Sequence, residues 1–147
     1  NRRGRIQKAY YGDEKNRIYA VTDQISLTQE DIREVQMAKG AIAAGIELMM
    51  EELEITYEQV DRVILCGAFG TYMNAKSAAR IGLIPEPLLS KVIAGGNAAG
   101  MGCRQITMDQ KLFALTGELV QKIEPLDLAS RPQFQRTFAK QMAFSEV

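Results

Sequence analysis

An apolar stretch that ends at a glycine constrains the fold of this chain more than any other feature. Residues 63–66 are Val-Ile-Leu-Cys, a short run rich in β-branched side chains, and Gly-Ala-Phe-Gly follows at once over residues 67–70. Such a run is typical of a strand that is buried on both faces of a sheet. Glycine has no Cβ, so the backbone there can turn sharply or approach a ligand closely. We therefore expect a strand, a glycine turn and then a helix with Asn74 as its N-cap.

The same order of features occurs a second time. Residues 92–94 predict another strand, residues 95–97 are Gly-Gly-Asn, and a helix rich in small residues is predicted over residues 98–106. In open α/β sheets, ligands bind outside the carboxyl ends of the strands. Backbone N–H groups of two glycine turns at one sheet edge suit a nucleotide or another anion. Each turn alone is a weak signal, and the two in this order form a candidate binding site.

The remaining strands are expected before this region. Residues 5–11 and 17–21 have strand composition and are joined by turn-forming residues, and residues 25–27 predict a short edge strand. After them, strands and helices alternate. We therefore predict one α/β domain over residues 1–147, with a ribonuclease H-like, five-stranded mixed sheet and helices on both faces. In that sheet, the strands at Val63 and Val92 are expected to be parallel neighbours.

The longest predicted helix spans residues 28–53. Thr28 and Asp31 form a capping box at its start, and apolar side chains then recur at helical spacing. A second face carries only small residues, at Ala38, Ala41 and Gly45. Gln36 and Lys39 are polar exceptions on this helix. A solvated charge is the favoured interpretation of Lys39, and a side chain that reaches a ligand at the strand ends is the alternative.

Helices dominate the second half of the chain. A short helix is predicted over residues 74–81, because Gly82 and Pro85 then follow as helix-ending residues. Further helices are expected after Thr107 and after Ser130, and residues 126–128 predict a short strand between them.

Composition excludes several classes of function. The chain has 18 basic and 18 acidic residues, so it has no long-range attraction to nucleic acid or to an anionic membrane. No apolar run approaches the roughly 20 residues that a membrane-spanning helix needs, and no signal peptide is present, so we expect a cytoplasmic protein. Because the chain starts at Asn1 in what looks like a strand, we expect it to be a fragment of something longer.

The reactive residue types are equally restrictive. The absence of histidine removes the Ser-His-Asp triad and most zinc sites. Cys66 and Cys103 form no Cys-x-x-Cys motif, so we interpret them as two buried thiols in a reducing compartment and predict no metal site. A Walker loop and a Gly-x-Gly-x-x-Gly fingerprint are also absent. The residues alone therefore leave the ligand class open.

Five segments of the sequence resemble the reductive activators of corrinoid proteins. The similarity runs in register from about residue 27 to the end and leaves the first 26 residues poorly covered. It is carried by residues 27–42 of the long helix, residues 61–70 with their Cys-Gly-Ala-Phe-Gly, and residues 79–85, 96–100 and 134–138. Members of that family resemble the superfamily of acetate kinase, sugar kinases, Hsp70 and actin, in which two ribonuclease H-like lobes enclose ATP.

The resemblance implies a function and a set of site residues. This family uses ATP to drive one-electron reduction of cob(II)amide to cob(I)amide on a partner corrinoid protein of a methyltransferase system. The chain would be the C-terminal lobe, facing its own N-terminal lobe. The implied nucleotide-binding residues are Gln36, Lys39, Gly67, Ala68, Phe69, Gly70, Gly96 and Asn97. Magnesium would be held by the other lobe, an iron–sulfur cluster would lie elsewhere in the full-length protein, and no catalytic residue is assigned.

Two alternatives stay open. The same fold serves other kinases and the activators of radical dehydratases, and a lobe with vestigial nucleotide contacts could act as a scaffold that docks a partner protein. The sequence also departs from the resemblance, since Cys66 stands where such proteins often have alanine. With the first lobe and the cluster cysteines absent, we expect the 147 residues alone to be inactive.

Overall fold

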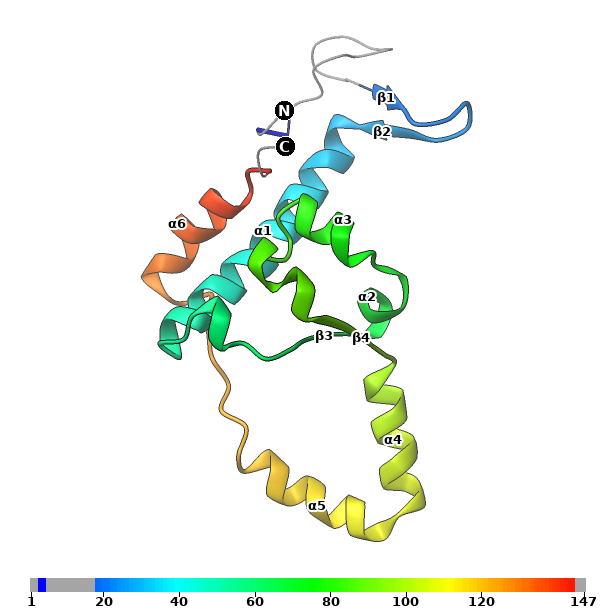
Figure 1. The fold of residues 1–147 in the computed structure, drawn as a ribbon, viewed down its shortest axis with the longest axis vertical. Helices are drawn as coiled ribbons and strands as arrows, with labels where there is room; N and C mark the ends of the chain where they lie inside the picture. Colours follow the sequence, from blue (N-terminus) through cyan, green and yellow to red (C-terminus); the bar gives the residue numbers. More distant parts are fainter. Residues whose placement is uncertain (1–2, 5–17, 145–147) are drawn as a thin grey trace.

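A parallel pair of strands, β3 (Val63–Cys66) and β4 (Val92–Gly96), forms the centre of the protein in the computed structural model, which describes residues 3–4 and 18–144 (Figure 1). Val63 lies opposite Val92, and the register shifts between Leu65 and Cys66. The predicted parallel pairing of these two strands is confirmed. Since parallel strands need a long crossover, the 25 residues between them contain α2 (Gly67–Tyr72), α3 (Ala75–Arg80) and the 3-10 helix η2 (Glu86–Lys91).

The hydrophobic core lies on one side of this pair. Its buried centre consists of Ala78, Leu83, Ile84 and Leu88, and alternate strand residues such as Val63, Leu65 and Val92 pack against it. On the opposite side, Ile64 is 57% exposed and Ile93 is 43% exposed. The prediction that β3 is buried on both faces is therefore wrong for the described residues. These residues supply helices to one face only, so the outward side chains remain open.

A second, separate pair of strands precedes the long helix. β1 (Ile18–Ala20) and β2 (Ser26–Thr28) are antiparallel, with Tyr19 opposite Leu27. They form no ladder with β3 or β4, so the described residues contain two two-stranded sheets where one five-stranded sheet is predicted. The strand expected over residues 5–11 lies outside the described residues. The strand expected over residues 126–128 does not form, because the Leu128 N–H donates locally to the Leu126 carbonyl, at 3.0 Å.

The long helix α1 (Gln29–Glu52) begins as predicted. The Thr28 hydroxyl accepts a hydrogen bond from the Asp31 N–H at 3.1 Å, and the Asp31 carboxylate accepts one from the Thr28 N–H at 2.7 Å. Ala38 and Ala41, expected on the packing face, are exposed. The small residues that α1 buries are Gly40, Ala43 and Ala44, so the predicted small face is displaced around the helix. Periodicity identified the helix, but it did not identify which small residues meet a neighbour.

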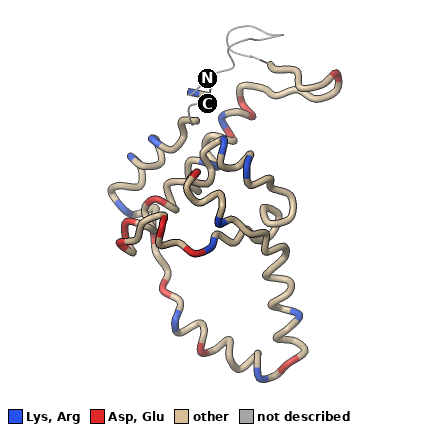
Figure 2. The backbone as a smooth tube through the Cα atoms, in the orientation of Figure 1, with Lys and Arg blue, Asp and Glu red and all other residues tan. Residues whose placement is uncertain are grey.

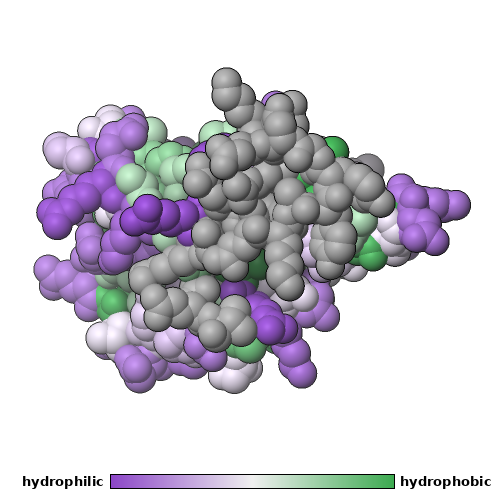
Figure 3. Space-filling model, turned by 90° about the horizontal axis from the view of Figure 1, so that it is seen from above, coloured by the Kyte–Doolittle hydropathy of each residue, from purple (hydrophilic) through white to green (hydrophobic). Residues whose placement is uncertain are grey.

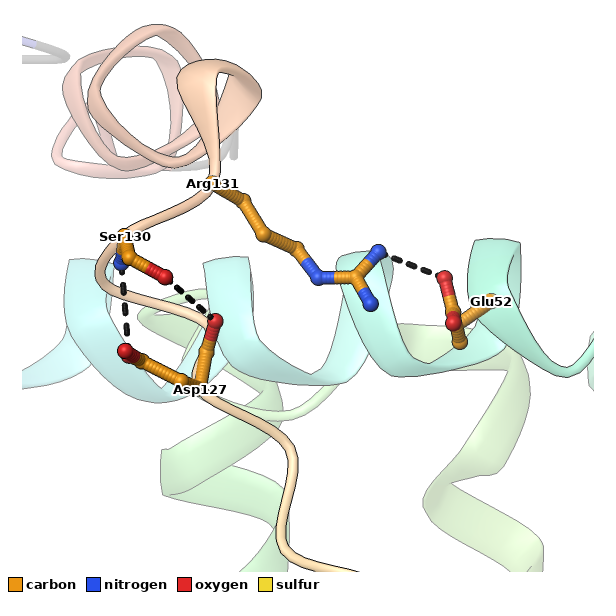
Figure 4. Close-up of polar contacts among 4 residues, drawn as sticks. All are labelled: Glu52, Asp127, Ser130 and Arg131. Carbon is orange, nitrogen blue, oxygen red and sulfur yellow. Dashed lines mark hydrogen bonds and ion pairs between the residues drawn. The ribbon is translucent and has the colours of Figure 1, made fainter.

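The neighbour is the C-terminal helix α6 (Pro132–Gln141), which runs antiparallel along α1 (Figure 1). Arg131, just before α6, points to Glu52 at the end of α1 with an N–O distance of 2.5 Å (Figure 4). Glu47 accepts hydrogen bonds from Lys140 and Gln141 at the other end of α6. Basic residues of the α6 region thus lie along the acidic second half of α1 (Figure 2).

Two more helices form an arm that projects from the end of β4. α4 (Ala98–Met108) and α5 (Gln110–Val120) pack mainly against each other, and residues 121–131 return from α5 to α6 (Figure 1). The short 3-10 helix η1 (Tyr57–Gln59) completes the set between α1 and β3. Seen from above, hydrophilic residues dominate the rim of the visible face, with hydrophobic ones only in small areas between them (Figure 3).

Candidate functional site

The carboxyl ends of β3 and β4 lie side by side, and each leads into a helix within two residues. Gly67 starts α2 directly after β3, and Gly96 ends β4 opposite Cys66. Both glycines have positive φ values, +69° and +56°, which L side chains rarely adopt. A Cβ built on either would meet no atom within 4 Å. The space in front of both glycines is therefore open, and backbone conformation is the reason that glycine is needed there.

Gly70 has a different reason to be glycine. A Cβ at this position would lie 2.0 Å from the Leu65 carbonyl oxygen and 3.1 Å from the Gly96 nitrogen. The helix α2 therefore approaches the backbone of both strands more closely than any side chain would allow. The sequence predicts a turn over residues 67–70, whereas the structure has the first turns of a helix, closed by a hydrogen bond from Met73 N–H to Phe69 O at 3.1 Å.

The residues around these glycines line an open edge. Ala68 is exposed, and the Phe69 side chain is 50% exposed, although large aromatic side chains are usually covered. Asn97 caps α4, because its side-chain oxygen accepts a hydrogen bond from the Gly100 N–H at 3.0 Å. Six of the eight predicted nucleotide-binding residues thus lie at or beside this edge. Within that group, Gly70 and Asn97 have structural roles of their own.

The other two predicted residues, Gln36 and Lys39, bind the end of the described chain. The Gln36 amide donates to the Met142 carbonyl oxygen at 2.9 Å, and the Lys39 ammonium donates to the carbonyl oxygen of Ala143. Both side chains are buried, with Lys39 only 1% exposed, so the favoured interpretation of Lys39 as a solvated charge is wrong. Burial lowers the pKa of Lys39. No polar contact among the described residues links Gln36 or Lys39 to the glycine edge, so their nucleotide role stays a prediction.

Sequence reasoning missed a cleft of about 400 Å³ between α1, α3, η2 and the end of α6. Apolar side chains such as Ile84 and Leu89 line it. Lys76 and Arg80 also line it from α3, and Glu47 and Glu86 line it from two other elements. Burial by itself raises the pKa of Glu47, but hydrogen bonds from Lys140 and Gln141 lower it overall. None of the predicted nucleotide-binding residues lines this cleft. The spacing of Lys76 and Arg80, one helical turn apart, was the available signal.

The described residues contain no group of three or more potential metal ligands. Cys66 and Cys103 are both free and exposed, so the expectation of two buried thiols is wrong. Cys66 lies on the open face of β3, and Cys103 lies on α4, which buries no residue. In the described part of the chain, no helix combines the length and apolarity that a bilayer crossing requires.

The parallel strand pair, with its carboxyl ends at an open glycine edge and a long helix behind the core, is an α/β arrangement. The family model that the chain matches assigns this arrangement to the actin-like ATPase class. Comparison with known proteins gives the family. Residues 2–147 match the model of the C-terminal domain of RACo, described as the ASKHA domain. The chain belongs to this family of corrinoid reductive activators.

Individual relatives agree with this assignment. The chain is 30% identical over 122 residues to the corrinoid activation enzyme RamQ of Eubacterium limosum, covering 83% of this chain and 21% of that protein. It is 26% identical to the [Co(II) methylated amine-specific corrinoid protein] reductase of Methanosarcina barkeri, over 82% of this chain and 22% of that protein. The solved structure of a reductive activator for corrinoid, iron-sulfur protein superimposes with a TM-score of 0.82 and 28% identity, over 98% of this chain and 25% of that one. The chain thus spans a fifth to a quarter of the length of these relatives.

Proposed function

We propose that this chain is the nucleotide-binding lobe of an activator that uses ATP to drive reduction of a corrinoid protein in the cytoplasm. An iron–sulfur centre outside these 147 residues would supply one electron to the partner's cob(II)amide, which would become cob(I)amide. The observation that carries the proposal is the edge where β3 and β4 end at Gly67 and Gly96, in a chain of the corrinoid-activator family. The partner is proposed to be a corrinoid protein of a methyltransferase system, in keeping with the names of the relatives.

Three features of the edge fit a nucleotide. No side chain projects from Gly67 or Gly96, so a phosphate or ribose can approach the backbone there. The half-exposed ring of Phe69 offers an apolar face to a base, and the neighbouring Ala68 adds no bulk. Bound ATP supplies the free energy that makes the reduction possible. This chain contributes by holding the nucleotide differently in two conformations, because only differential affinity can shift an equilibrium between them.

Other parts of the proposal concern the complete protein. We propose that the N-terminal lobe holds magnesium, and that the fold of the complete protein includes one five-stranded mixed sheet. One observation favours the scaffold alternative: Gln36, Lys39 and Asn97 each use a polar atom of the side chain for a contact within the chain, although the side-chain oxygen of Gln36 has no hydrogen-bond partner among the described residues. On that alternative, the lobe docks a partner protein and its nucleotide contacts are vestigial. Another kinase or a dehydratase activator remains the alternative within the same fold.

An ATP titration of the full-length protein tests the proposal. Phe69→Ala removes the exposed ring at the edge, and we expect it to weaken ATP binding about tenfold, equivalent to about 1.4 kcal/mol. Tyr72→Ala is the matched control, because Tyr72 lies on the same helix and is 87% exposed. If calorimetry gives the same ATP affinity for Phe69→Ala and Tyr72→Ala, the adenine base does not bind at this edge. A wild-type protein that binds no ATP but still binds the corrinoid protein would favour the scaffold.

A further inference from the structure

The helices α4 and α5 expose an unusual amount of apolar surface. Neither helix buries a single residue, although both are rich in large apolar side chains. Phe113 is 63% exposed and Met108 is 75% exposed. We call the following set the arm surface: Met101, Met108, Phe113, Leu115, Leu119, Val120 and Ile123. Soluble domains rarely leave so many neighbouring large apolar side chains uncovered, and such surfaces mark interaction sites.

The contacts that the arm makes within the described residues are too few to stabilise it. Its two helices are 11 residues each, a length at which isolated helices are marginal in water. They pack mainly against each other, and the arm stands away from the core around Ile84 and Leu88 (Figure 1). A helix that is apolar around its circumference is normally buried. A further element must therefore cover the arm.

The charge and apolarity of the arm surface indicate what kind of element covers it. Residues 98–124 carry three basic and three acidic side chains, spread along the arm (Figure 2). A surface without net charge gives no electrostatic steering, which transient partners commonly use. Permanent interfaces are instead more apolar, like a domain core cut in half. A cover that left and returned would expose Phe113, Val120 and Ile123 to water at each cycle.

The relatives contain a long stretch of polypeptide outside the part that this chain matches, and that stretch could cover the arm permanently. They are four to five times as long as the part that this chain matches, and the matching family model is a C-terminal domain. The solved relative matches 98% of this chain, arm included, within such a longer chain. We propose that the arm surface is the docking site for the preceding part of the same polypeptide, which packs apolar side chains between and around α4 and α5. This inference rests on family membership and deepens the proposed function, since it names the surface that joins this lobe to the rest of the protein.

Hydrogen exchange and thermal unfolding of the full-length protein test this assignment. We expect the amides of residues 112–120 to exchange at least about a hundredfold more slowly than in an unstructured peptide, at low protein concentration and without corrinoid protein. Phe113→Ser should remove most of this protection and lower the melting temperature by several degrees. Glu118→Ser is the matched control: it puts the same residue on the same helix without removing an apolar side chain, so it should leave the protection of the arm in place.

Three outcomes would overturn the proposal. Fast exchange over residues 112–120 in the full-length protein would mean that the arm is uncovered. Protection that rises with protein concentration would assign the surface to a second copy. Protection that appears only after purified corrinoid protein is added would assign it to that partner. An ATP titration on the same samples distinguishes the two proposals. A full-length protein that binds no ATP would contradict the nucleotide proposal, whereas slow exchange of the arm in that protein would still support the docking proposal.

Discussion

The ammonium group of Lys39 donates its hydrogen bond to the carbonyl oxygen of Ala143, 104 residues further along the chain. The same ammonium lies 5.5 Å from the centre of the Phe144 ring. No carboxylate of the described residues pairs with it, and its side chain is 1% exposed. A buried cation held by a carbonyl and an aromatic ring is poorly compensated for the water that it loses. Lys39 therefore connects α1 to the chain after α6 at a cost in stability.

Replacing this lysine by an apolar side chain of similar length should stabilise the protein. Lys39→Met keeps the packing and removes the buried charge, so we expect a gain of about 1 kcal/mol in the free energy of unfolding at pH 7. Lys39→Ala should instead destabilise the protein, because it leaves a cavity. Urea denaturation measures both variants. A less stable Lys39→Met would show that the charged hydrogen bond outweighs the desolvation.

The pH dependence of Lys39 has a defined sign. Burial lowers the pKa of the folded state below the ordinary value of 10.5, so the unfolded chain binds more protons between the two pKa values. The destabilisation caused by burying charged Lys39 is therefore absent above pH 10.5. It grows as pH falls through the folded-state pKa, so stability is lost in that range. The stability difference between Lys39→Met and wild type should shrink as pH rises toward 10.5. A difference that stays constant from pH 7 to 10 would contradict this.

Two glycines of α1 should respond in opposite ways to alanine. A Cβ at Gly40 would lie 3.0 Å from the Met142 Cγ and 3.3 Å from its backbone nitrogen, so α6 would have to shift. A Cβ at Gly45 would meet only Leu128 Cδ1, at an ordinary 3.6 Å. Gly45→Ala should stabilise the protein by about 0.5–1 kcal/mol through helix propensity, whereas Gly40→Ala should show no gain or a loss. Equal gains in melting experiments would mean that α6 is free to move.

A pair of substitutions at Gly67 separates backbone strain from ligand contact. Asparagine tolerates positive φ, so Gly67→Asn should stay folded and still weaken ATP binding, because its side chain enters the open space. A β-branched side chain cannot adopt this φ easily, so Gly67→Val should also lose stability by roughly 1–3 kcal/mol. Circular dichroism and a nucleotide titration give the two readouts. A folded Gly67→Asn with wild-type affinity would place Gly67 outside the nucleotide site.

The start of α1 should be sensitive to acid. Hydrogen bonds from the Thr28 N–H and the Thr28 hydroxyl lower the pKa of Asp31 below 3.8. Stability from this carboxylate is present above pH 3.8 and is lost as pH falls through its lower folded-state pKa. Asp31→Asn should therefore remove part of the acid-induced loss of stability below pH 3.8. The comparison is made from pH 2 to 5 by thermal unfolding, and parallel curves for the two proteins would rule out this contribution.

Local features of the sequence predicted local structure well. The capping box of Thr28 and Asp31, the Asn74 cap and the strands at Val63 and Val92 all form, because each depends on neighbours in the chain or on a short apolar run. The glycines at 67 and 96 were identified for the same reason, since a change of backbone direction after a strand is a local requirement. These features depend on interactions that span only a few residues.

Long-range partners were not predictable. The resemblance implies a nucleotide role for Gln36 and Lys39, which stays a prediction. Their hydrogen bonds within the chain go to carbonyls more than 100 positions away, and nothing in helical spacing identifies those partners. The apolar run over residues 63–66 predicts burial of Ile64 and Cys66 on a second sheet face, but the described residues provide no layer there. Whether a strand face is covered depends on which elements are present, and composition does not contain that information.

The pairing of α1 with the last residues of the described chain also sets an order of events during synthesis. A ribosome that adds about 5–20 residues per second makes Ala143 roughly 5–20 s after Lys39. During that interval the face of α1 around Gly40 has no α6 to cover it. A nascent chain therefore presents this face to chaperones until α6 has emerged from the ribosome, and the lobe can close only after Ala143 has been made.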